Sequence, residues 1–169
     1  MATVATSNYT ERQFIPPVLT GTRCSDWLCV TQGQIDAFAA ATGDMQSIHR
    51  SDAEHANGLF RGPIAHGLLL VSLAMGLARE SGALPDATWV LYGFEKLRFR
   101  APVRSGARVR CLTTVNGVRK LAGKTLLNVR YVMEIQDERI PAFVADCLLL
   151  NLGRASDSAA AAPDVCLAG

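Results

Sequence analysis

Two short polar segments of this chain carry residue types that could move a proton. The first contains Asp44 and His49, five positions apart, and the second runs from Gly62 to the dipeptide His66-Gly67. A carboxylate and an imidazole that lie close together can hold one water molecule and transfer protons near neutral pH. The pair therefore predicts acid–base chemistry. The structural alternative is an aspartate that caps a turn beside a half-buried histidine.

The dipeptide His66-Gly67 opens a long apolar segment with the sequence HGLLLVSLAMGLARES. If this segment is a helix, its first N–H groups have no partner within the helix, and that end carries a partial positive charge. A glycine at this position lets a ligand approach the backbone closely. The segment predicts a site that polarises a carbonyl as negative charge develops on its oxygen. For His66 itself, a hydrogen-bonded core position is the alternative.

Neither a metal centre nor a serine nucleophile is predicted. The spacings of six and eleven residues between His49, His55 and His66 match no common pattern of metal ligands. Ser72 lies inside the apolar segment without a G-x-S-x-G motif around it. The cysteines are odd in number, irregularly spaced and free of C-x-x-C, which favours reduced thiols in a cytoplasmic protein. They are Cys24, Cys29, Cys111, Cys147 and Cys166.

Helices are expected around the two polar segments, and strands after them. A capping-box pattern at Thr31 and Gln34 predicts a helix that ends near Gly43, and Ser51 begins a second, shorter helix that ends at Gly58. The almost uniformly apolar segment 66–81 predicts a helix that protein encloses on most sides. A short strand is expected over 27–30, and longer ones over 87–100, 108–118, 125–135 and 143–152. Turn residues separate the longer strands at 102–106, 116–117, 123 and 137–141.

The order of these elements predicts an α+β fold. No alternation of strands and helices occurs, which excludes a doubly wound sheet, whereas one antiparallel sheet wrapped around the long central helix satisfies the pattern. Residues 1–22 are expected to form an arm, 23–153 the domain, and 154–169 a disordered tail. The N-terminus lacks the apolar core of a secretory signal, and no apolar segment is long enough to span a membrane, so no membrane partner is expected.

The formal net charge of +2 conceals an uneven distribution. Residues 1–95 have a net charge of −4, residues 96–130 carry ten bases and no acid, and residues 131–169 again have a net charge of −4. The central block predicts an anionic group near the later strands. Nucleic acid is disfavoured, because Phe99 alone interleaves the bases and acidic segments flank them.

The two polar segments also resemble a known family. The stretch FAAATGDMQSIHRSDAEHA followed by FRGPIAHGLLLVSL resembles the hydratase motif of the MaoC-like dehydratase family, which includes the (R)-specific enoyl-CoA hydratases. The pieces YGFEKLRFRAPVRSGARVR and IPAFVADCLLL look like the strands that follow in that family. The resemblance covers residues 28–152, is greatest to the nodulation protein N-like branch, and implies the hot dog fold.

The resemblance implies that Asp44 and His49 are a catalytic dyad. They would hold a water that adds to the β-carbon of a trans-2-enoyl thioester, and which of them takes which proton stays open. The N–H of Gly67 would bind the thioester carbonyl, with Gly62, Ile64 and His66 at the substrate. Many members have Asn-Pro where this chain has Gln46-Ser47, and this departure is expected to affect the rigidity of the loop rather than the dyad.

The implied partners follow from the same resemblance. The substrate would be an acyl-CoA or acyl-carrier thioester, with coenzyme A as part of the substrate and no separate cofactor, and the protein would be a homodimer. Arg98, Arg100 and Arg104 are expected to attract the phosphates of coenzyme A, and a solvated face of the sheet is the alternative. A hot dog thioesterase and a non-catalytic acyl-thioester binding protein are the alternative functions.

Overall fold

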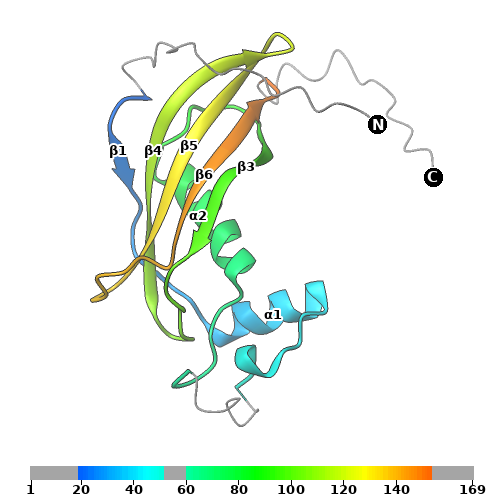
Figure 1. The fold of residues 1–169 in the computed structure, drawn as a ribbon, viewed down its shortest axis with the longest axis vertical. Helices are drawn as coiled ribbons and strands as arrows, with labels where there is room; N and C mark the ends of the chain where they lie inside the picture. Colours follow the sequence, from blue (N-terminus) through cyan, green and yellow to red (C-terminus); the bar gives the residue numbers. More distant parts are fainter. Residues whose placement is uncertain (1–18, 52–59, 154–169) are drawn as a thin grey trace, which may run out of the picture.

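The computed structural model describes residues 19–51 and 60–153 (Figure 1). The first part contains strands β1 (Thr22–Cys24) and β2 (Leu28–Cys29), helix α1 (Gln32–Thr42) and the short 3-10 helix η2 (Ser47–His49). The second part contains helix α2 (Gly67–Glu80) and strands β3 (Trp89–Phe99), β4 (Arg108–Leu121), β5 (Lys124–Ile135) and β6 (Phe143–Asn151).

All the strands belong to one antiparallel sheet with the order β1-β4-β5-β6-β3, and β2 pairs with a second part of β4. Strand β3 follows α2 in the sequence but lies at the far edge of the sheet. Figure 1 shows the curved sheet with α2 against one face, and with α1 and the start of α2 together at one end. The predicted α+β architecture, an antiparallel sheet around a central helix, is confirmed.

The core lies between α2 and the sheet. Alternate residues of β4 and β5 face it, among them Val109, Cys111 and Val129, which have no exposed surface. Their partners from α2 include Leu70 and Ala74. The burial of these strand residues follows the two-residue alternation of apolar residues along both strands.

The expectation that protein encloses α2 on most sides is only partly met. One side of the helix is buried against the sheet, whereas Leu68 is 59% exposed, and Ser72 and Gly76 are also exposed. A sheet can cover one side of a helix, and among the described residues nothing covers Leu68 on the other side. This exposed apolar surface lies next to the candidate site.

One expectation about the strands is wrong, and one strand was missed. Asn116-Gly117 is not a turn: β4 continues to Leu121, with an irregularity between Val115 and Gly117 that leaves Asn116 unpaired. The hairpin turns at Ala122 and at Gly123, where a turn was predicted, and their φ angles of 48° and 77° suit a two-residue turn. Strand β1 was not predicted, because its three residues are exposed and pair with β4 through the backbone, without an apolar alternation.

Other expectations lie outside the described residues. These are most of the N-terminal arm, the helix expected from Ser51 to Gly58, and the tail 154–169. Within the described residues, no helix is long and apolar enough to cross a membrane.

Candidate functional site

The loop between α1 and α2 begins where Gly43 ends α1. Gly43 has a φ of 77°, in the left-handed region that glycine adopts readily, and its N–H donates to the carbonyl of Ala39 at 2.8 Å. Thr31 and Gln34 form the predicted capping box at the other end of the helix. The left-handed residue turns the chain back toward the start of α2, with Asp44 as the first residue after the turn.

His49 is held in a defined tautomer. It is 6% exposed, and its Nδ1 lies 2.7 Å from the carbonyl oxygen of Ile64. Because a carbonyl oxygen can only accept, Nδ1 carries the proton, and Nε2 of the neutral ring has a free lone pair. The backbone carbonyl of His49 accepts a hydrogen bond from Nε2 of Gln32 at 2.9 Å. His49 is therefore fixed at both its ring and its backbone.

Asp44 lies half-buried beside this ring, and its carboxylate accepts a hydrogen bond from Nε2 of Gln46 at 2.9 Å. This bond lowers the pKa of Asp44 below its ordinary value, and the nearby His49 and His66 lower it further, against an opposing effect of burial. Asp44 is thus ionised at neutral pH. The expectation that Gln46 affects only loop rigidity is wrong, because its side chain touches the carboxylate of the dyad.

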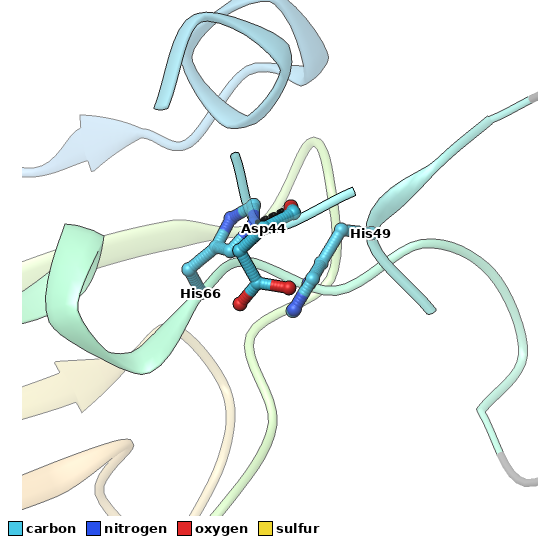
Figure 2. Close-up of side chains that lie close together, drawn as sticks. All are labelled: Asp44, His49 and His66. Carbon is cyan, nitrogen blue, oxygen red and sulfur yellow. Dashed lines mark hydrogen bonds between the residues drawn. The ribbon is translucent and has the colours of Figure 1, made fainter. Parts of the chain in front are cut away.

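His66 joins this pair at the start of α2. It is 3% exposed, and its Nε2 lies 3.0 Å from the backbone carbonyl oxygen of Asp44. Its ring stacks on that of His49, with centroids 3.6 Å apart and an interplanar angle of 24°. Figure 2 shows the carboxylate of Asp44 and a ring nitrogen of His49 directed toward each other, with His66 bonded to the backbone of Asp44.

These three residues could also be considered as ligands of a metal ion, because their ligand atoms lie within 4.8 Å of one another. An imidazole binds a metal in the plane of its ring. The rings of His49 and His66 are stacked and nearly parallel, so their lone pairs run side by side rather than converge. The geometry suits a carboxylate and one imidazole that act together on a water molecule.

Gly67 supplies a free backbone N–H at this place. The first α-helical bond of α2 joins the N–H of Leu70 to the carbonyl of His66, so the N–H of Gly67 precedes the bonded turns. A Cβ on Gly67 would lie 2.6 Å from Cζ of Phe99. The missing side chain thus makes room for the Phe99 ring, a close approach that the sequence did not predict.

The site opens into a largely apolar cavity of about 570 Å³. Six of the predicted site residues are on its wall: Asp44, His49, Ile64, His66, Gly67 and Arg100. Three others, Gly62, Arg98 and Arg104, are not among the lining residues. The rest of the wall is mainly apolar and includes Phe38, Phe60, Leu68, Leu70, Phe99, Ala101 and Val103.

The basic block lies largely on strands, where Arg110 and Arg130 alternate with buried residues and therefore point to the face of the sheet away from α2. Arg110, Arg119 and Arg130 pair with the carboxylates of Glu134, Glu95 and Asp146, at 2.7, 4.0 and 2.7 Å. Phe99 pairs with the buried Phe143 on the cavity side of the sheet. Arg98 is its neighbour on β3 and therefore points to the opposite face. The site contains one arginine of this block on its wall, Arg100.

Sequence reasoning missed three residues of the site. Gln32 and Gln46 hold the backbone of His49 and the carboxylate of Asp44, and Phe99 packs on Gly67. The position of Gln46 between the two members of the dyad was a usable signal. Gln32 and Phe99 meet the site only through the fold, so their types and spacing carried no such signal.

A comparison with models of known protein families matches residues 17–136 to the MaoC like domain. The chain belongs to the MaoC-like dehydratase family. This finding confirms the resemblance and, with it, a hydratase or dehydratase chemistry on thioesters as the activity of the family. The dyad, Gly67 and the cavity are thus the candidate active site of a family member.

Individual relatives agree with this assignment. The chain is 35% identical to 3-hydroxyacyl-thioester dehydratase Z of Mycobacterium tuberculosis over 127 residues, which cover 74% of this chain and 84% of the relative. It is 34% identical to nodulation protein N of Rhizobium leguminosarum over 131 residues, with coverage of 75% and 81%.

A third relative supports both the family and the fold. The chain is 34% identical to the (R)-specific enoyl-CoA hydratase of Aeromonas caviae over 87 residues, with coverage of 52% and 63%. The solved structure of the (R)-hydratase from A. caviae superposes with a TM-score of 0.64 at 22% identity, over 85% of this chain and 98% of that one. The fold is thus the hot dog fold that the resemblance implied.

Proposed function

We propose that this protein is a hydratase that adds water to trans-2-enoyl thioesters and gives (R)-3-hydroxyacyl thioesters. The observation that carries the proposal is the pairing of an ionised carboxylate, Asp44, with the free Nε2 of His49 at an apolar cavity beside the start of α2. The (R) configuration is taken from the likeness to the hydratase of A. caviae.

In the first half of the reaction, a water molecule lies between the carboxylate of Asp44 and Nε2 of His49. Nε2 takes one proton while the water oxygen forms a bond to the β-carbon. The electrons of the double bond move toward the thioester carbonyl, which becomes an enolate oxygen. The N–H of Gly67 donates a hydrogen bond to this oxygen at the positive end of α2.

In the second half, the imidazolium of His49 returns its proton to the α-carbon and the carbonyl forms again. Asp44 accepts the other hydrogen bond of the water and stabilises the imidazolium by its negative charge. The sum is the addition of one water molecule, with His49 and Asp44 restored and no further reactant. Because one base takes and returns the proton, H and OH add to the same face of the double bond.

Coenzyme A is the carrier that the site favours in this proposal. Arg100, an exposed cation on the cavity wall, suits a phosphate at the entrance, and the apolar wall suits the acyl chain. The site holds no separate cofactor in this scheme. An acyl-carrier protein would present the same thioester through its phosphopantetheine arm.

The stereochemical claim is tested with crotonyl-CoA and two coupled dehydrogenases. The hydrated product should be oxidised by an (R)-specific 3-hydroxyacyl-CoA dehydrogenase and left unchanged by an (S)-specific one. Hydration carried out in D₂O, followed by NMR of the product, should give the single diastereomer of same-face addition. An (S) product would overturn the proposed configuration.

We also propose that the protein works as a homodimer through β3. Within residues 19–51 and 60–153, this strand has no partner on its outer edge, and it bears the exposed apolar residues Val90, Leu91 and Tyr92. An open apolar edge is a template for pairing with another chain. Light scattering should give twice the mass of the chain, Tyr92→Lys should reduce it to that of a monomer, and Ile140→Lys, at an exposed position off this edge, should not.

A reducing compartment such as the cytoplasm is proposed from the cysteines. Cys24, Cys29, Cys111 and Cys147 are free thiols in the described residues. Burial raises the pKa of Cys111 to about 11, which keeps this thiol protonated and unreactive. Thiol titration of the denatured protein without reductant should count every cysteine of the chain as free, and a lower count would contradict the proposal.

A further inference from the structure

His66 contacts both members of the dyad. Its Nε2 lies 3.0 Å from the backbone carbonyl oxygen of Asp44, and its ring stacks on that of His49 at a centroid distance of 3.6 Å. Phe38 packs against His66 with the two ring centroids 5.0 Å apart. His66 also precedes Gly67, so it touches or adjoins every group that the proposed reaction uses.

The hydrogen bond and the burial of His66 leave it no accessible polar atom for chemistry. The carbonyl of Asp44 can only accept, so Nε2 of His66 carries the proton and donates it. The other nitrogen, Nδ1, is buried and has no hydrogen-bond partner among the described residues. A substrate atom thus meets neither a donor nor an accessible acceptor on this ring. This differs from the substrate-binding role that the sequence implied.

We propose that His66 is a positioning residue, which fixes the backbone of Asp44 and the ring of His49 relative to the N–H of Gly67. The inference rests on the proposed hydratase function. It adds to that function a residue that holds three separate segments of the chain in contact. The loop after α1, the 3-10 helix η2 and the start of α2 all meet at this ring. Because reacting groups must lie within a fraction of an ångström of their productive geometry, the loss of this contact costs rate rather than affinity.

Two substitutions separate the contacts of His66. His66→Phe keeps a flat ring against His49 but removes the donor to Asp44, and His66→Gln keeps an amide donor but removes the stacked ring. With crotonyl-CoA, we expect kcat to fall about 10- to 100-fold in His66→Phe, with KM within about twofold. The fall should be smaller in His66→Gln if its amide reaches the same carbonyl.

The control is a variant that is destabilised to the same degree far from the dyad. Val129→Ala removes two methyl groups from a fully buried residue of β5 that does not line the cavity. Below the melting temperature of each variant, Val129→Ala should keep the kcat of the wild type, whereas His66→Phe should not. Should His66→Phe fail to fold, His66→Gln carries the comparison.

Two outcomes would overturn the proposal. A raised KM with an unchanged kcat would make His66 a substrate-binding residue. A loss of rate that follows the loss of thermal stability equally in His66→Phe and Val129→Ala would make its role merely structural.

An NMR measurement tests the geometry without any turnover. Long-range ¹H–¹⁵N spectra of the wild type should show the Nε2–H tautomer for His66 and the Nδ1–H tautomer for His49. The Nδ1–H tautomer for His66 would overturn the proposed contact even in an active enzyme. The predicted tautomers together with an absence of hydration would instead refute the proposed function and leave the geometry intact.

Discussion

The start of α2 and the basic strands differ in how the chain brings their polar groups together. At α2, three segments meet so that Asp44, His49 and His66 contact one another within a few ångströms. Of the ten bases in residues 96–130, eight lie on β3 to β5, and three of these pair with acids from other parts of the chain. The first region brings proton-transfer groups into contact, whereas the second spreads its bases along the strands and pairs some of them with acids.

The largest expected effect comes from the dyad. Asp44→Asn and His49→Ala should each lower kcat for hydration of crotonyl-CoA by about a thousandfold or more, because each removes a group that holds or moves a proton of the water. For Asp44→Asn, circular dichroism and thermal melting should remain close to those of the wild type, since Asp44 is only half-buried. Activity above a tenth of the wild-type value in both variants would contradict the claim that the reaction takes place at the start of α2.

Gly67→Ala should have the next largest effect. The added Cβ would meet the ring of Phe99 at 2.6 Å, so either the ring or the first turn of α2 must move. We expect kcat/KM to fall roughly 10- to 100-fold, because the N–H aimed at the thioester carbonyl is displaced. The double variant Gly67→Ala, Phe99→Ala should regain stability relative to Gly67→Ala; if it does not, the close approach is not the cause.

The basic block should give a smaller effect confined to one residue. Arg100→Ala should raise KM for crotonyl-CoA about two- to fivefold, which is the effect expected from the loss of one exposed ion pair. KM for a short crotonyl thioester without phosphates should stay unchanged. Arg98→Ala is the matched variant, since Arg98 points away from the cavity. Equal effects of the two variants on KM would mean that the basic block attracts the substrate by its total charge and not by a contact of Arg100.

The smallest effect is expected at a paired charge. Arg130 donates to both carboxylate oxygens of Asp146, at 2.7 and 2.9 Å, and thereby lowers the pKa of this carboxyl. Asp146→Asn should reduce the free energy of unfolding by about 1 kcal/mol at neutral pH without changing kcat. Because the folded pKa is lowered, the difference should shrink as the pH falls below about 4 and the carboxyl is protonated. A difference that persists at low pH would exclude the ion pair as its cause.

The sequence predicted what depends on local pattern. The capping box at Thr31, the end of α1 at Gly43 and the inward faces of β4 and β5 follow from side chains and their spacing. It failed at Asn116-Gly117, because the pairing with β5 extends β4 through an irregularity there. Strand β1 was missed because its three exposed residues show no apolar alternation and are defined as a strand by their pairing with β4.

The site was predicted only in part, because only some of its contacts depend on local sequence pattern. The members of the dyad are neighbours in the sequence, and the family pattern marks them. The contacts of Gln32 and Phe99 depend on how the segments meet in space. The faces of the arginines depend on the register of β3, which placed Arg98 on the side opposite Phe99. Side-chain types alone could not distinguish Arg98 from Arg100.

The most direct test of the central claim compares hydration with hydrolysis of one substrate. The purified full chain is incubated with crotonyl-CoA, and the loss of the conjugated enoyl thioester is followed beside the release of free coenzyme A thiol. The account predicts rapid formation of 3-hydroxybutyryl-CoA with negligible thiol release, and loss of this activity in Asp44→Asn. Thiol release faster than hydration, or ligand binding with neither reaction, would contradict it in favour of a thioesterase or a non-catalytic acyl-thioester binding protein.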